Sequence, residues 1–168
     1  THERQLEDCR EQLLSFLDAV SWLGNKLGPL LVQLPPKLEF QSDIAEKFFS
    51  FLRSQHDRTL VCEPRHQSWL GKEAAQLFSR YQILYVTPDP LVIGNGPTPE
   101  QQGGAYYRLH GSPHMYYSSY SDDFLLKFAN KLSQISQFDV WCIFDNTARG
   151  HAVSNALQTQ TYLQEKLC

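Results

Sequence analysis

Three observations make this sequence an α/β protein with a parallel sheet built from strand–helix units. Short apolar runs alternate along the chain with longer segments in which apolar residues recur at helical spacing. The runs 83–86 and 140–144 are apolar on both strand faces, which is typical of parallel strands covered on both sides. Five strands between residues 29 and 168 give about 28 residues per unit, whereas a closed eightfold barrel has roughly 250 residues. The chain therefore holds about five of eight units, which fits either a smaller open sheet or an incomplete barrel.

Each expected strand is an apolar run that ends at a proline, a glycine or a polar residue. Two prolines stop the first run, and Pro64 stops the second. The five runs cover residues 29–34, 59–63, 83–90, 105–111 and 139–146. Residues 91–104 are rich in Gly, Pro and Gln and carry no periodicity, so we expect a long loop between the third and fourth strands.

Five segments show the spacing of amphipathic helices. The first, residues 3–23, places Leu6 and Leu13 on one face and ends near Gly24. The third begins after Ser68, whose hydroxyl can cap the first turn. The apolar faces of the second, third and fourth helices carry Ile44, Phe48, Phe51 and Leu52, then Leu70, Ala74, Leu77 and Phe78, then Leu125, Phe128, Leu132 and Ile135. The last helix is expected over about residues 148–166.

Composition and charge narrow the classes of partner. Hydrophobic residues make up 42% of the 168 residues, which is enough for a packed core and excludes disorder. The net charge of -3 excludes a global basic field for nucleic acid or anionic membranes, although it allows a local patch. No apolar run approaches 18 residues, and residues 1–12 are too polar for a signal peptide. We therefore expect no membrane association and a cytoplasmic location.

The positions of the four cysteines also favour a cytoplasmic location. They stand far apart, at positions 9, 62, 142 and 168, and form no CxxC pair. A disulfide framework or a zinc knuckle is therefore not expected, and free thiols in a reducing compartment are.

Polar residues gather where the expected strands end. In parallel α/β sheets, the carboxyl ends of the strands form the functional face. The residues at these ends are Glu63, Arg65, His66, Asp89, Arg108, His110, Asp145 and Asn146. We expect them to meet at one rim, with Glu63, His110 and Asp145 as the acid–base candidates and the others as substrate-binding groups.

Alternation along residues 105–111 sharpens this expectation. It places Tyr106, Arg108 and His110 on one face of the strand and Tyr107 and Leu109 on the other. A partly buried Arg108 needs an anion or a carboxylate as its partner. That partner is either a bound anionic ligand or an internal ion pair with Glu63 or Asp145, and the residues leave both interpretations open.

The same rim offers donors for a divalent metal ion. A hard or borderline metal prefers oxygen and imidazole ligands, and the candidates are Glu63, His66, Asp89, His110 and Asp145. No HxH or HExxH spacing occurs, so a metal site stands beside the alternative of polar groups satisfied among themselves.

Two further segments are candidates for ligand contact. The tyrosines Tyr116, Tyr117 and Tyr120 can stack on a base or a sugar, or their loop can pack back onto the rim. Residues 144–156 lead from a strand end through a turn at Gly150 into the last helix. The N-terminus of that helix can bind phosphate, or it can be a capped helix end with no ligand.

Taken in order, the segments GPLLVQLPP, EPRHQSW, YYRLHG and FDNTARGHAVSNA resemble the YecE-like family, catalogued as domain of unknown function 72. The resemblance covers nearly the whole chain, and its most specific motifs are ExRHxSW and YxRLHG. It implies a TIM-type (β/α) barrel in which residues 1–168 form one domain and supply strands four to eight, the first three being absent. Family members usually carry two asparagines after the last strand, whereas here Asp145 precedes Asn146 and adds a carboxylate.

The resemblance implies no established reaction, so two functions are expected from it. The first is an enzyme, in the longer parent a metal-assisted hydrolase of a phosphorylated or anionic substrate at the barrel mouth, by fold analogy with barrel endonucleases. Arg108 and the helix start at Gly150 would hold the anion. The second is a non-catalytic binding module for nucleic acid or a protein partner. A chain of five units should itself be inactive and should self-associate through the open edge at Leu30.

Overall fold

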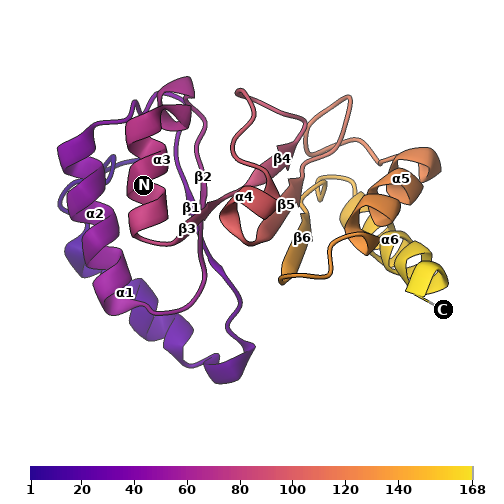
Figure 1. Ribbon diagram of the computed structural model, residues 1–168, viewed down its shortest axis with the longest axis horizontal. Helices are drawn as coiled ribbons and strands as arrows, with labels where there is room; N and C mark the ends of the chain where they lie inside the picture. Colours follow the sequence, from indigo (N-terminus) through magenta and orange to yellow (C-terminus); the bar gives the residue numbers. More distant parts are fainter. Residues whose placement is uncertain (168) are drawn as a thin grey trace. The chain divides into compact units, whose positions relative to one another are not determined.

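The computed structural model describes residues 1–167, which form two compact units (Figure 1). Unit 1 comprises residues 1–85 and 93–96, and unit 2 comprises residues 86–92 and the chain from residue 97 onward. Each unit contains one three-stranded parallel sheet. Within residues 1–167, every helix is too short or too polar to cross a membrane.

The sheet of unit 1 has the strand order β1-β2-β3, so strands that follow one another in the chain are also neighbours. The register pairs Leu30 with Leu60, and Leu60 with Ile83. Helical connections allow this parallel pairing, because a tight turn cannot return the chain to the same end of the sheet. The elements are α1 (Arg10–Ser21), η1 (Gly24–Lys26), β1 (Leu30–Gln33), α2 (Ser42–Gln55), β2 (Leu60–Glu63), η2 (Gln67–Leu70), α3 (Lys72–Arg80) and β3 (Ile83–Tyr85).

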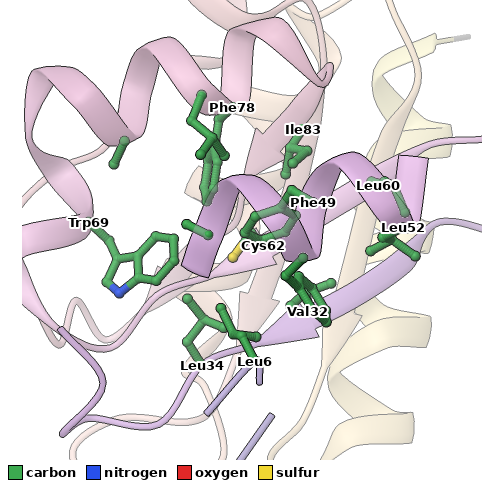
Figure 2. Close-up of a cluster of buried hydrophobic side chains, with 14 of the residues drawn as sticks. Leu6, Val32, Leu34, Phe49, Leu52, Leu60, Cys62, Trp69, Phe78 and Ile83 are labelled. Carbon is green, nitrogen blue, oxygen red and sulfur yellow. The ribbon is translucent and has the colours of Figure 1, made fainter. Parts of the chain in front are cut away.

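The core of unit 1 lies between one face of this sheet and helices α2 and α3 (Figure 2). Alternation along β2 sends Leu60 and Cys62 into the core and leaves Glu63 on the opposite face. The rings of Phe49, Trp69 and Phe78 meet with centroids 5.3–6.3 Å apart. Burial of each such side chain contributes about 2–3 kcal/mol, so the three rings are a substantial part of the stabilisation of unit 1.

Unit 2 repeats the plan with the strand order β4-β5-β6. Helices α5 and α6 pack against each other, and together with them Tyr107 and Leu109 of β5 form the core. Tyr106 and Arg108 lie on the other face of β5, as the alternation predicts. The elements are β4 (Thr87–Asp89), α4 (Pro99–Gln102), β5 (Ala105–Leu109), α5 (Asp122–Ser133), β6 (Val140–Phe144) and α6 (His151–Leu167).

The predicted partial TIM-type barrel of five strand–helix units is wrong. The described residues form six strands in two open three-stranded sheets. The run 83–90, expected as one strand, divides at Val86 into β3, which pairs with β2, and β4, which pairs with β5. A barrel needs each strand paired along both edges. Pro88 has no amide hydrogen, so β4 lacks one of the donors that a strand with two neighbours uses. That residues 1–168 form a single domain stays a prediction.

Two helices begin later than their periodicity predicts. Helix α1 begins at Arg10 because Leu6 and Asp8 have φ values of 75° and 44°, which a right-handed helix does not accept. Helix α6 begins at His151 because Gly150, with φ at 76°, closes a turn before it.

Ser68 does not cap the third helix. Residues 67–70 form the short η2 turn, and α3 begins after Gly71. The Ser68 hydroxyl instead accepts the Phe40 N–H at 2.8 Å. Ser68 therefore does not cap a helix but holds the segment that precedes α2 through a hydrogen bond.

Candidate functional site

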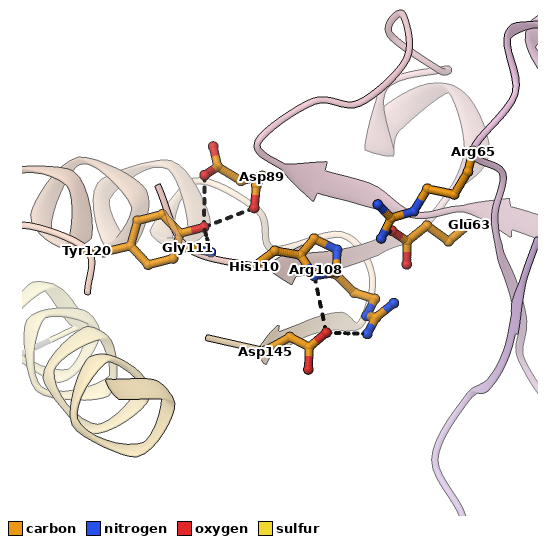
Figure 3. A network of polar contacts seen from close by, with 8 residues as sticks. All are labelled: Glu63, Arg65, Asp89, Arg108, His110, Gly111, Tyr120 and Asp145. Carbon is orange, nitrogen blue, oxygen red and sulfur yellow. Dashed lines mark hydrogen bonds and ion pairs between the residues drawn. The ribbon is translucent and has the colours of Figure 1, made fainter. Parts of the chain in front are cut away.

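Three polar side chains meet at the carboxyl ends of β5 and β6 in unit 2 (Figure 3). Arg108 Nη2 donates to Asp145 Oδ2 at 2.5 Å, and His110 Nδ1 lies 3.1 Å from the same oxygen. The Asp145 N–H donates to the Leu109 carbonyl at 2.8 Å, which extends the β5–β6 pairing and brings Asp145 opposite His110. The Arg108 side chain is 12% exposed, that of Asp145 28%, and the imidazole is buried. The internal ion pair with Asp145 that the sequence left open is therefore present.

A tyrosine hydroxyl links the ends of β4 and β5. Tyr120 Oη donates to Asp89 Oδ1 at 2.9 Å and accepts the Gly111 N–H at 2.8 Å (Figure 3). Burial raises the pKa of Tyr120 well above its ordinary value, and the Asp89 carboxylate adds to the increase, so the hydroxyl keeps its proton. Gly111 has φ at 96°, and a Cβ there would lie 2.7 Å from the Ser118 carbonyl oxygen. Only glycine fits this position.

Two buried asparagines connect the loop of residues 112–119 to α6. Asn146 Nδ2 donates to the Ser118 carbonyl at 3.0 Å and to Asn155 Oδ1 at 2.8 Å. Asn155 Oδ1 also accepts the Tyr120 N–H at 3.1 Å, and Asn155 Nδ2 donates to Ser119 Oγ at 3.1 Å. Asn146 is fully buried. In this structure Asn146, predicted to bind substrate, holds the loop against the helix.

The predicted site residues of unit 1 form a local arrangement after β2. Arg65 Nη2 lies 2.5 Å from Glu63 Oε1, and both side chains are buried (Figure 3). His66 Nδ1 accepts the Ser68 N–H at 3.3 Å and lies 2.8 Å from the Ser68 hydroxyl. His66 thus caps η2, while Glu63 and Arg65 form an ion pair within one segment of chain.

An open hollow of about 460 Å³ lies between the loop after β5 and the start of α6. Its lining residues are Pro113, His114, Tyr117, Ser118, Ser119, Arg149 and His151. The Arg149 guanidinium carbon is 6.0 Å from the centroid of the Tyr117 ring. None of these seven residues is acidic, so the hollow is basic in a chain whose net charge is -3.

Gly150 lies between two of the lining residues but uses its own N–H in the turn. That N–H donates to the Thr147 carbonyl at 3.0 Å. The left-handed conformation of Gly150 carries the chain from Arg149 to His151, which both line the hollow. A direct contact of Gly150 with phosphate stays a prediction.

Within residues 1–167, no three His, Cys, Asp or Glu side chains come together in a way that could hold a metal ion. His110 and Asp145 contact each other, whereas Asp89 bonds to Tyr120. In unit 1, Glu63 contacts Arg65, and His66 contacts Ser68. The described residues therefore give the predicted divalent metal no donor set.

Sequence reasoning brought together Arg108, His110 and Asp145 and named Tyr117 of the hollow, but it did not name the side chains of His114, Arg149 and His151 as site residues. The residues of the hollow lie on irregular segments, where no periodicity marks which side chains share a surface. One signal was available: Arg149 and His151 flank a glycine in the turn between a strand end and a helix. Such a turn exposes its neighbouring side chains at the carboxyl end of the sheet.

Fold and site together define an α/β protein with two open parallel sheets, in which unit 2 carries both a polar cluster at its strand ends and a basic hollow. The family described as "Protein of unknown function DUF72" matches residues 1–167. The chain belongs to this family, which confirms the resemblance inferred from the motifs. None of the curated proteins compared with the chain matches it.

Solved structures of the same family are similar in fold. A DUF72 family protein from Thermotoga maritima MSB8 is 26% identical with a TM-score of 0.80, and the match covers 98% of this chain and 70% of that one. A DUF72 family protein from Enterococcus faecalis V583 is 24% identical with a TM-score of 0.68, covering 96% of this chain and 72% of that one. Neither description names a substrate or a reaction.

Proposed function

We propose that the chain binds a phosphorylated or otherwise anionic ligand in the hollow beside α6. One observation carries the proposal: His114, Arg149 and His151 come from two different segments and line the same hollow, without an acidic neighbour among its lining residues. Arg149 carries a permanent positive charge, and none of the other lining residues is a carboxylate that would neutralise it, so the hollow favours an anion.

Phosphate suits these groups chemically. The planar fork of Arg149 can donate two parallel hydrogen bonds to phosphate oxygens. The imidazoles of His114 and His151 and the hydroxyls of Ser118 and Ser119 add neutral or charged donors around it. A hydrogen bond to a charged group is worth about 1.5–3 kcal/mol, so the guanidinium should contribute most of the affinity.

Arg108 is a weaker candidate than Arg149 for binding the anion. Its guanidinium already pairs with Asp145 at 2.5 Å and is largely buried. Removing one partner of a buried pair costs up to about 3–5 kcal/mol, which exceeds the gain from one phosphate hydrogen bond. We propose that Arg108 instead neutralises Asp145 and so limits the repulsion between that carboxylate and the anion.

Calorimetric titration with inorganic phosphate tests the proposal. Arg149→Gln should weaken binding roughly tenfold to hundredfold, because it removes a charge-assisted hydrogen bond. Arg80→Gln is the matched control, since that side chain is 63% exposed on α3 of unit 1 and pairs with Glu46. It should leave the affinity unchanged. Equal affinities of the wild type and Arg149→Gln would refute the proposal.

A second candidate is acid–base catalysis on such a ligand, and the contact between His110 and Asp145 favours it. A carboxylate that fixes the orientation of an imidazole is a recurrent arrangement for proton transfer. In phosphodiester hydrolysis, the oxygen of water would bond to phosphorus as the ester P–O bond breaks. Asp145 or His110 would take the proton of the attacking water, and the leaving oxygen would take a proton from a solvent water molecule.

Turnover of bis(p-nitrophenyl) phosphate separates the two candidates. If the chain is a hydrolase, the wild type releases p-nitrophenol and Asp145→Asn releases it at least about a hundredfold more slowly. A wild type that binds phosphate but shows no turnover, with either Mg²⁺ or EDTA present, is a binding module.

A further inference from the structure

We propose that the ligand of the hollow is a nucleotide, held by its phosphate at Arg149 and by its base on the ring of Tyr117. This inference rests on the proposed function, since it assigns the phosphate to the same side chains, with Arg149 foremost. It adds the chemical class of the group to which the phosphate is attached.

The size of the hollow is the first argument. Its volume of about 460 Å³ falls in the range of roughly 300–1,000 Å³ that is usual for sites of small organic ligands. A bare inorganic anion would leave most of that space to water. The phosphate is therefore expected to belong to a larger molecule that extends across the hollow from Arg149.

The ring of Tyr117 is the second argument. Tyr117 is 54% exposed, whereas four of the other tyrosines, Tyr85, Tyr106, Tyr107 and Tyr120, are buried. The guanidinium carbon of Arg149 lies 6.0 Å from the ring centroid, at the outer limit of a cation–π contact. The guanidinium that would hold the phosphate thus lies over the ring, and more than half of the Tyr117 surface stays exposed next to it. A planar base joined to that phosphate through a sugar can reach that surface.

The two serines of the lining suit the sugar that joins the phosphate to the base. Ser118 and Ser119 follow Tyr117 directly, and both line the hollow. Hydroxyl and backbone groups of this kind can bond a sugar hydroxyl, as donors or as acceptors. Arg149, the two serine hydroxyls and the Tyr117 ring thus line one hollow. They correspond to the phosphate, the sugar and the base of a nucleotide.

The test compares four small molecules by calorimetry: inorganic phosphate, ribose 5-phosphate, adenosine and AMP. Stacking of one base on an aromatic side chain is expected to make AMP bind about 5- to 150-fold more tightly than ribose 5-phosphate. Tyr117→Leu should reduce this ratio to near one. Trp22→Leu, which removes another exposed aromatic side chain in unit 1 (87% exposed), should leave the ratio unchanged.

The outcomes separate this inference from the proposed function. Equal affinities of AMP and ribose 5-phosphate for the wild type would overturn the nucleotide and leave anion binding intact. A ratio that survives Tyr117→Leu would overturn the stacking on Tyr117. If inorganic phosphate and AMP both fail to bind, the inference and the proposed function fall together.

A free nucleotide and the 5′-phosphorylated end of a nucleic-acid strand share this chemistry. A further binding experiment distinguishes them. A 5′-phosphorylated ten-residue DNA strand is compared with AMP and with the same strand lacking its phosphate. Tighter binding of the phosphorylated strand than of AMP identifies a strand end. Binding of AMP that the longer strand does not improve identifies a free nucleotide.

Discussion

Unit 1 and unit 2 use the same arrangement of three parallel strands and covering helices, yet their charged groups are satisfied in different ways. In unit 1, Glu63 pairs with Arg65, two residues further along the same segment. In unit 2, Asp145 receives Arg108 and His110 from a neighbouring strand. The Glu63–Arg65 pair of unit 1 joins residues of one segment, whereas the cluster in unit 2 depends on correct pairing of β5 with β6.

Both cores contain packed aromatic rings, and unit 2 adds the hydrogen bonds of buried asparagine side chains. In unit 1, Phe49, Trp69 and Phe78 pack ring against ring. In unit 2, the buried side chains of Asn146 and Asn155 join the loop after β5 to α6 by hydrogen bonds. Apolar packing tolerates small shifts, but a buried hydrogen bond is lost when its geometry changes. The position of the loop after β5 in unit 2 therefore depends on these hydrogen bonds as well as on apolar packing.

The largest expected effect is on thiol reactivity, which reports on each core separately. Burial raises the pKa of Cys142 in unit 2 to about 12, and burial followed by the charge of Glu63 raises the pKa of Cys62 in unit 1. Because the thiolate is the nucleophile, Cys142 should react with iodoacetamide at pH 8 about a thousandfold more slowly than an ordinary thiol. Its rate should rise about tenfold per pH unit up to pH 12.

Peptide mapping by mass spectrometry measures these rates, with the partly exposed Cys9 as the internal control. Cys62 should be the slowest of these three thiols. The same pKa increases also lower stability at high pH, because the thiols of the unfolded chain ionise above about pH 8.5 while the folded ones stay neutral. Labelling of Cys142 as fast as that of Cys9 would contradict a closed core in unit 2.

The next largest effect is expected from Trp69→Ala. The substitution removes a fully buried ring and its hydrogen bond to the Leu38 carbonyl, and it should lower the free energy of unfolding by about 3–5 kcal/mol. Urea denaturation measures the loss, and amide exchange should show it to be largest in β1, β2 and β3. Trp69→Phe keeps part of the packing and should cost less than half as much. A loss below 1 kcal/mol would contradict the role given to the aromatic core.

Asn146→Asp breaks the asparagine connection in unit 2 with little change in shape. The new carboxylate would be buried beside the Ser118 carbonyl and Asn155 Oδ1, and it cannot donate to either. We expect a loss of about 3 kcal/mol in stability and weaker phosphate binding. Asn25→Asp, at an exposed position of η1, is the control. Thermal unfolding and phosphate titration that match the wild type would exclude the connection as a support of the hollow.

Arg53→Ala has the smallest expected effect and belongs to unit 1. The guanidinium donates to the carbonyls of Tyr81, Gln82, His56 and Arg58 at 2.8–3.1 Å. Removing it should cost about 2 kcal/mol, because these partly exposed carbonyls can turn to water. Arg53→Lys should recover only part of the loss, since one ammonium cannot reach four carbonyls. Denaturant unfolding checks the loss, and a fully stable Arg53→Ala would contradict it.

Local rules predicted part of this molecule well. The period of two in residues 105–111 predicts that Arg108 and His110 point to the same side of this extended segment, because side-chain direction in a strand depends only on position. The partner of Arg108 was left open, since Asp145 reaches it through the register between β5 and β6, a property of pairing. The family was also identified correctly from short motifs.

Other features depend on long-range pairing and could not be predicted from a single segment. Residues on both sides of Val86 are extended, so nothing local shows that β3 and β4 belong to different sheets. The hollow depends on the course of the loop at residues 112–119, which a left-handed Gly111 and the side chain of Asn146 determine. Neither feature produces a periodic pattern.

The hydroxyl of Tyr120 has a consequence for entropy. Its bond with the Gly111 N–H closes a loop whose ends are nine residues apart, and that loop carries His114 and Tyr117. Closing a loop removes most of the conformations that a free chain would sample, and folding has already lost that freedom. A ligand that enters the hollow therefore meets side chains on an ordered backbone, and less of its binding free energy is used to restrict the protein.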